Sequence, residues 1–114
     1  MARDDATLLD IANAARLIES FIQGMTKESF LLDTKTQSAI LHQIMVIGEA
    51  AKRLSQPFRE QHSMLPWSLM AGMRDHLIHG YDAVDLGEVW KTATGDIPDL
   101  LDKLEPILPR RPSE

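Results

Sequence analysis

Apolar residues recur along the chain in steps of three and four, the period of an amphipathic helix. The first stripe follows Asp4 and Asp5, either of which is predicted to cap the start of the helix, and it ends near Gly24. The stretch 26–33 is expected to be a connector that holds one short helical turn. The members of the first stripe are Leu8, Ile11, Ala12, Ala15, Ile18, Ile22 and Met25.

A second helix is predicted to begin after Asp33, a favourable N-cap residue. Gly48 lies inside it, at a cost of about 1 kcal/mol relative to alanine, which indicates close packing against another helix. Pro57 is expected to end the regular part, with a ragged continuation to His62. The apolar stripe consists of Ile40, Ile44, Ile47, Ala51 and Leu54.

The third helix is predicted to carry Pro66 in its first turn and to end just before Gly80. A fourth helix opens with a capping-box-like pattern at 85–88, and Pro98 is expected to kink it. Residues 109–114 are predicted to be a frayed tail. These elements predict an all-α fold, an up-and-down bundle of four helices in a single domain spanning residues 1–114.

Composition agrees with one soluble domain, since 44% of the 114 residues are hydrophobic and 25% are charged. The absence of cysteine excludes disulfides, thiolate zinc sites and cysteine nucleophiles. Apolar runs are too short to span a membrane, and the N-terminus does not resemble a signal peptide, so a cytoplasmic location is expected. The net charge of -5 argues against binding nucleic acid by bulk charge but leaves room for a small basic site.

Candidate chemistry gathers in residues 74–81, which contain Arg74, Asp75, His79 and Tyr81. Histidine titrates near neutral pH, and the arginine fork fits phosphate. If the helix continued through this stretch, Asp75 and His79 would share a face, and Asp75 could fix the histidine tautomer through Nδ1. Arg74 and Tyr81 are seven residues apart and would also share a face.

Other interpretations of the same residues remain open. An arginine near a helix end is commonly a surface residue or part of a salt bridge, and a histidine commonly packs or caps. His76 and His79 are spaced three apart, as in some metal sites. The further imidazoles are His42 and His62, and no motif links them to this pair, so no metal site is predicted.

The sequence from Arg74 to Tyr81 resembles the Arg-x4-His-x-Tyr motif of HepT-like proteins, a branch of the HEPN superfamily. Three further segments resemble that family in the same order and spacing. They are Val-Ile-Gly-Glu-Ala-Ala-Lys-Arg-Leu at 46–54, Pro66-Trp67 followed by Ala71-Gly72-Met73-Arg74, and Val84-Asp85-Leu86 with Val89-Trp90. The resemblance therefore covers nearly the whole chain.

The resemblance implies a four- to five-helix bundle that forms a homodimer and acts as the toxin of a toxin–antitoxin pair. The implied activity is metal-independent endoribonuclease cleavage of RNA, with no cofactor, in which Arg74 stabilises phosphate and His79 transfers protons. The supporting role expected of Asp75 comes from its helical spacing to His79 and not from the resemblance. The implied partner is an MNT-type nucleotidyltransferase antitoxin that silences the nuclease by transferring AMP to Tyr81.

One position departs from the family pattern, because Asp75 stands where asparagine is common. An ionised aspartate cannot donate a hydrogen bond to phosphate. The alternative function is therefore a non-catalytic interaction or nucleotide-binding module paired with a nucleotidyltransferase. If RNA is the substrate, its contact is expected to depend on a patch around Arg74, helped by Lys52 and Arg53.

Methionine suits adaptable contact surfaces, and five large apolar residues exceed what a lone small bundle must bury. A partner interface is therefore expected to use some of them, with core filling as the alternative for each. These residues are Met45, Met64, Trp67, Met70 and Met73.

Overall fold

The chain is all-α, as the periodicity predicts, in a computed structural model that describes residues 2–78 and 83–109. Within these ranges the one β feature is an isolated antiparallel bridge between Ile78 and Val84. The elements in order are α1 (Ala2–Ile22), α2 (Lys27–Leu31), α3 (Thr34–Arg53), α4 (Gln56–Gln61), α5 (Trp67–Leu77), α6 (Leu86–Lys91), the π-helical turn η1 (Thr92–Asp96), α7 (Ile97–Leu104) and the 3-10 turn η2 (Glu105–Ile107).

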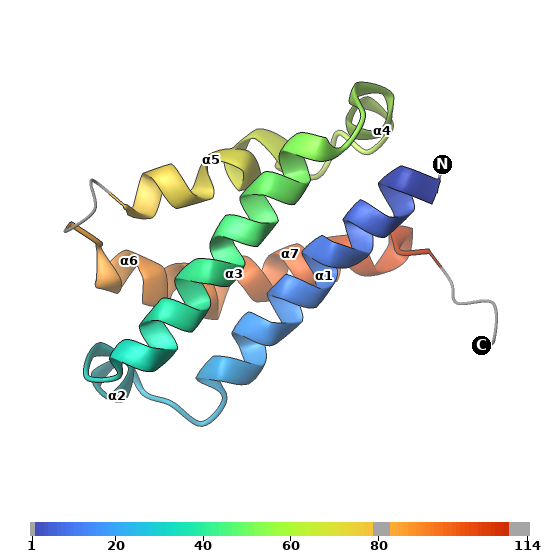
Figure 1. Cartoon of the computed structure of the whole chain (residues 1–114). Helices are drawn as coiled ribbons and strands as arrows, with labels where there is room; N and C mark the ends of the chain where they lie inside the picture. The colour runs from blue at the N-terminus through green and yellow to red at the C-terminus, as the bar shows by residue number, and fades with distance from the viewer. Residues whose placement is uncertain (1, 79–82, 110–114) are drawn as a thin grey trace.

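The bundle is built around α1 and α3, which lie side by side, with α5 packed on α3 and α7 packed on α1 (Figure 1). The short helices α2 and α4 lie near opposite ends of α3. Leu8, Ile11, Ile40, Ile44 and Ile47 are fully buried, so the predicted stripes of α1 and α3 form the centre of the core. None of the described helices is both long and apolar enough to cross a membrane.

The connector after α1 folds through local caps. Gly24 has a φ of 78°, the left-handed conformation that ends many helices and that glycine adopts without steric cost. Thr26 and Ser29 then cap α2 reciprocally, each side chain accepting from the other's backbone N–H. Asp33 caps α3 by accepting from Thr36 N at 3.0 Å, as predicted from its position.

The close packing predicted at Gly48 is confirmed. A β-carbon at this position would lie 3.4 Å from the backbone oxygens of Met70 and Ala71. The absence of a side chain on Gly48 therefore allows the backbones of α3 and α5 to approach each other. This contact fixes where α5, the helix that carries Arg74, crosses the bundle.

The chain after α3 differs from the prediction of a helix that ends at Pro57. Leu54 leaves the helix in an extended conformation, and a second helix, α4, begins at Gln56. Pro57 lies in the first turn of α4, where its missing N–H is not needed. Ser55 caps this helix by accepting from Phe58 N at 3.3 Å.

The predicted capping role of Asp4 or Asp5 is wrong, because α1 begins at Ala2 and both residues lie inside its first turn. Asp4 is only 5% exposed, and its carboxylate accepts from Ser55 N at 3.0 Å and from Ser55 Oγ at 2.7 Å. These two hydrogen bonds lower the pKa of Asp4 from its ordinary value near 3.8. Asp4 therefore ties the start of α1 to the start of α4.

Replacing Asp4 by asparagine is expected to lower the melting temperature at pH 7. Because folding depresses the pKa of Asp4, its contribution to stability is present above the unfolded pKa, about 3.9, and is lost as the pH falls through the folded value. The difference between wild type and Asp4→Asn should therefore shrink below about pH 4. Thermal melting across pH checks this, with the exposed neighbour Asp5→Asn as the control. Equal effects of both variants would contradict it.

The last predicted helix forms with an irregularity near the expected kink. Asp85 caps α6 by accepting from Glu88 N at 3.1 Å. The π-helical turn η1 then comes directly before α7, which carries Pro98 near its start. Proline removes a backbone donor, and both proline and π-helical turns are causes of helix kinks. Of the predicted tail, residues 110–114 lie outside the described residues.

Three of the five residues expected to favour a partner interface belong to the core instead. Trp67, Met70 and Met73 are 6%, 1% and 8% exposed, because they line the face of α5 that packs inward. Met45 and Met64 are exposed at 38% and 82%. An interface that uses methionine is therefore confined to the latter two among these residues.

Candidate functional site

The helix that carries the motif ends earlier than predicted. α5 stops at Leu77, and Ile78 is extended, with φ -117° and ψ 113°. Ile78 forms the β bridge to Val84, and Asp85 N donates to Leu77 O at 3.0 Å. These contacts hold residues 77–78 against residues 84–85. Because α5 ends at Leu77, the predicted helix end at Gly80 is wrong.

His79 and Tyr81 lie outside the described residues, so their predicted roles are not tested by the structure. The helix on which they were expected to share faces with Asp75 and Arg74 ends before them, at Leu77. Helical spacing ceases at Ile78, and the four-residue step from Asp75 to His79 no longer implies a shared face. The same holds for the seven-residue step from Arg74 to Tyr81.

Arg74 is accessible on the last turns of α5. Its side chain is 52% exposed, and its Nη1 lies 3.4 Å from Oδ1 of Asp75. The side chain of Asp75 is 79% exposed. Such solvent-exposed pairs contribute little to stability because water and salt screen them. Arg74 is therefore available to an incoming anion, and among the described residues Asp75 is the carboxylate that competes for it.

Lys52 and Arg53, which are expected to help Arg74, lie on a different helix from it. They end α3, which leads into α4, whereas Arg74 lies toward the α6 end of α5 (Figure 1). The close approach of Gly48 to the backbone of Met70 and Ala71 lies between the end of α3 and Arg74. The two groups of cations therefore lie on different helices, on either side of the α3–α5 contact, and their joint action on RNA stays a prediction.

The described histidines have different surroundings. His76 and His42 are exposed, whereas the ring of His62 packs at a tilt against Phe58, with a centroid distance of 4.6 Å. The backbone oxygen of His62 accepts from Trp67 Nε1 at 2.9 Å, so this residue has a structural role. Over residues 2–78 and 83–109, no three histidine, aspartate or glutamate side chains lie close enough together to hold a metal ion.

Comparison with known proteins identifies close relatives. The model of a family described as ribonuclease HepT-like matches residues 11–107. A protein of Thermococcus cleftensis named "Probable ribonuclease HepT" is 46% identical over 100 residues, which cover 88% of this chain and 91% of that protein. A protein of Caldanaerobacter subterraneus subsp. tengcongensis, named as an RNase, is 40% identical over 87 residues, covering 76% and 78% of the two chains.

A Methanocaldococcus jannaschii protein, also named as an RNase, is 37% identical over 103 residues, covering 90% of this chain and 89% of that protein. No solved structure gives a significant match. The matched region contains the whole stretch from Arg74 to Tyr81.

Proposed function

Because the chain belongs to the HepT-like ribonuclease family, we propose that it is a metal-independent endoribonuclease whose reaction depends on Arg74 and His79. The observation that carries the proposal is the Arg-x4-His-x-Tyr motif inside the region matched by the family. The exposure of Arg74 supports it, since a cation that binds a phosphodiester must be reachable from solvent.

The proposed reaction is transesterification within the RNA. A base removes the proton from a 2′-hydroxyl, O2′ forms a bond to the adjacent phosphorus, and the bond from phosphorus to O5′ breaks. An acid delivers a proton to O5′, so the products end in a 2′,3′-cyclic phosphate and a 5′-hydroxyl. Histidine suits the proton transfers, and arginine suits the negative charge on the non-bridging oxygens. We assign these roles to His79 and Arg74.

A two-fold dimer would supply both an acid and a base. Two His79 side chains facing one cleft could divide the proton transfers, and two Arg74 side chains would double the local positive charge. Doubling matters here because the chain has a net charge of -5 and cannot attract RNA by its overall field. Apolar side chains that could form such a contact are exposed, among them Leu32 at 88% and Leu69 at 61%.

We further propose that the chain is the toxin of a toxin–antitoxin pair and that an MNT-type nucleotidyltransferase silences it by adding AMP to Tyr81. Tyr81 follows His79 by two residues. An attached AMP would place a phosphodiester and a bulky base beside the groups that must receive RNA. Its negative charge would occupy the position of the substrate phosphate.

An assay of the purified protein on mixed RNA, with and without EDTA, tests the proposed function. We expect cleavage in both conditions and 2′,3′-cyclic phosphate ends on the products. Activity that disappears in EDTA would contradict metal independence. RNA that stays intact in both would favour the second candidate, a non-catalytic interaction or nucleotide-binding module, which the contact between Asp75 and Arg74 supports.

A further inference from the structure

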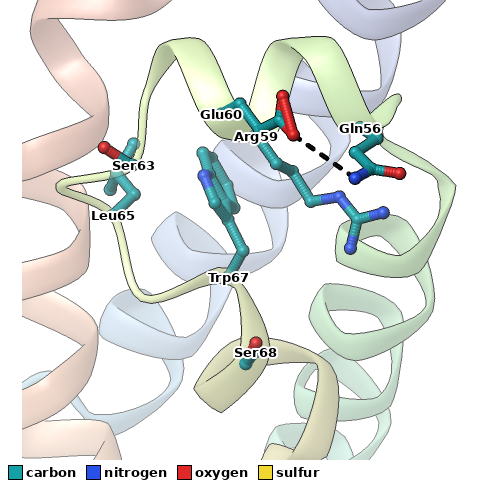
Figure 2. A pocket seen from close by; sticks show the side chains of 7 residues that line it. All are labelled: Gln56, Arg59, Glu60, Ser63, Leu65, Trp67 and Ser68. Atoms are coloured by element: carbon teal, nitrogen blue, oxygen red, sulfur yellow. Dashed lines mark hydrogen bonds between the residues drawn. The ribbon is translucent and has the colours of Figure 1, made fainter.

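A hollow of about 450 Å³ opens where α4 meets the start of α5 (Figure 2). It lies toward the opposite end of α5 from the motif, and the proposed reaction does not use it. Leu65 and Trp67 give it an apolar wall, and five polar side chains complete its lining. These polar residues are Gln56, Arg59, Glu60, Ser63 and Ser68.

Arg59 is the group in the hollow whose surroundings are incomplete. Its Nε is buried and lacks a hydrogen-bond partner, and within the described part of the chain no carboxylate lies within ion-pair distance of its guanidinium. Figure 2 shows the guanidinium extending from α4 beside the Gln56–Glu60 hydrogen bond. The guanidinium is therefore not held by a carboxylate of the described chain, and its terminal nitrogens can donate to an anion that enters the hollow.

Several other polar groups of the hollow already have partners. Trp67 Nε1 donates to His62 O at 2.9 Å, and Glu60 Oε1 accepts from Gln56 Nε2 at 3.3 Å. The side chains of Ser63 and Ser68 also line the hollow. An anion with several acceptor oxygens matches this set, and the arginine fork fits phosphate in particular.

Trp67, which lines the hollow, begins the helix α5 that also carries Arg74. Trp67 and Arg74 are seven residues apart, which on an α-helix is about 20° out of line and about 10 Å along the axis. An RNA strand bound at Arg74 and running along α5 toward α4 would carry a neighbouring phosphate to the hollow. We propose that Arg59 binds a phosphodiester of the RNA that flanks the cleaved bond, an inference that rests on the proposed function.

Binding of a short fluorescent single-stranded oligoribonucleotide tests this, with His79→Ala protein in EDTA so that no cleavage intervenes. Arg59→Gln is expected to weaken binding about tenfold. It should also reduce the slope of log affinity against log salt by about 0.7, the value for one phosphate contact on a single strand. Arg16→Gln is the matched control, because Arg16 has the same charge and is paired on the surface with Glu105 at 2.9 Å.

Two further variants keep the test independent of any folding defect. Glu60→Gln removes the negative charge from the hollow and should tighten RNA binding. Arg59→Lys keeps the charge but loses the fork, so its affinity should lie between those of Arg59→Gln and the parent protein. Melting temperatures identify any variant that fails to fold.

Equal RNA affinity of Arg59→Gln and Arg16→Gln would overturn the proposal. So would an effect of Arg59→Gln on the binding of inorganic phosphate alone, with RNA affinity unchanged. The assay is separate from catalysis. If wild-type protein does not cleave RNA but RNA binding still depends on Arg59, the phosphate site in the hollow is supported and the proposed reaction is rejected. If wild-type protein cleaves RNA but binding does not depend on Arg59, only the phosphate site is rejected.

Discussion

Replacing His79 by alanine is expected to slow RNA cleavage in EDTA by about 100- to 10,000-fold, the usual contribution of a positioned general acid or base. The reason is that His79 is assigned both proton transfers, and alanine can neither accept a proton from O2′ nor deliver one to O5′. The measurement is the initial rate of cleavage of a labelled oligoribonucleotide, at equal concentrations of folded protein.

His76→Ala is the matched control for this prediction. His76 lies three residues earlier, is exposed on α5 and has no role in the proposed reaction. It should cleave at close to the wild-type rate. If His79→Ala retains the wild-type rate, or if both alanine variants lose activity to the same extent, the assignment of proton transfer to His79 is wrong.

Coexpression with a neighbouring nucleotidyltransferase is expected to abolish cleavage and to add AMP to Tyr81. The attached phosphodiester would compete with RNA for Arg74, so the loss should approach that caused by removing His79. Mass spectrometry of the peptide that contains Tyr81 measures the adduct, and the cleavage assay measures silencing.

Tyr81→Phe is the control for this switch, because phenylalanine keeps the ring and lacks the hydroxyl that would receive AMP. The variant should remain active alone and stay active after coexpression. An unmodified Tyr81 peptide from silenced protein would show that the nucleotidyltransferase inhibits cleavage without modifying Tyr81. Silencing of Tyr81→Phe equal to that of wild type would show the same.

Helices whose stripes face one core were predictable from the sequence. Asp33 caps α3 and Gly48 meets the backbone of α5, as expected, because both effects depend on local geometry or on a single missing side chain. Pro57 was misassigned because proline can follow the end of one helix or occupy the first turn of the next. Only the extended Leu54 between α3 and α4 decides which applies.

Features that depend on distant residues were not predictable. Asp4 is separated from Ser55 by 51 positions, so a local argument assigned it to its own helix end. The end of α5 at Leu77 depends on the bridge between Ile78 and Val84, which no helical pattern contains. No sequence motif indicates a role for Arg59, because its place in the hollow and the burial of its Nε exist only in the folded chain.

Charge at the candidate site was only partly predictable. The motif identifies Arg74. The sequence predicts that Asp75 pairs with His79, whereas in the described structure Asp75 lies 3.4 Å from Arg74. Aspartate at this position therefore has two opposite expected effects. If it holds His79, its loss slows the reaction, and if it competes for Arg74, its loss frees that side chain for RNA. The described contact is the one with Arg74, so we expect the second effect.

The central claim, that Arg74 serves phosphate cleavage without metal, is tested most directly by kcat/KM on one oligoribonucleotide in EDTA for three proteins. They are wild type, Arg74→Ala and Asp75→Asn. We predict cleavage by wild type, a loss of about 100- to 1,000-fold for Arg74→Ala, and no loss for Asp75→Asn, with a gain that is largest at low salt. Equal kcat/KM for wild type and Arg74→Ala would contradict the account.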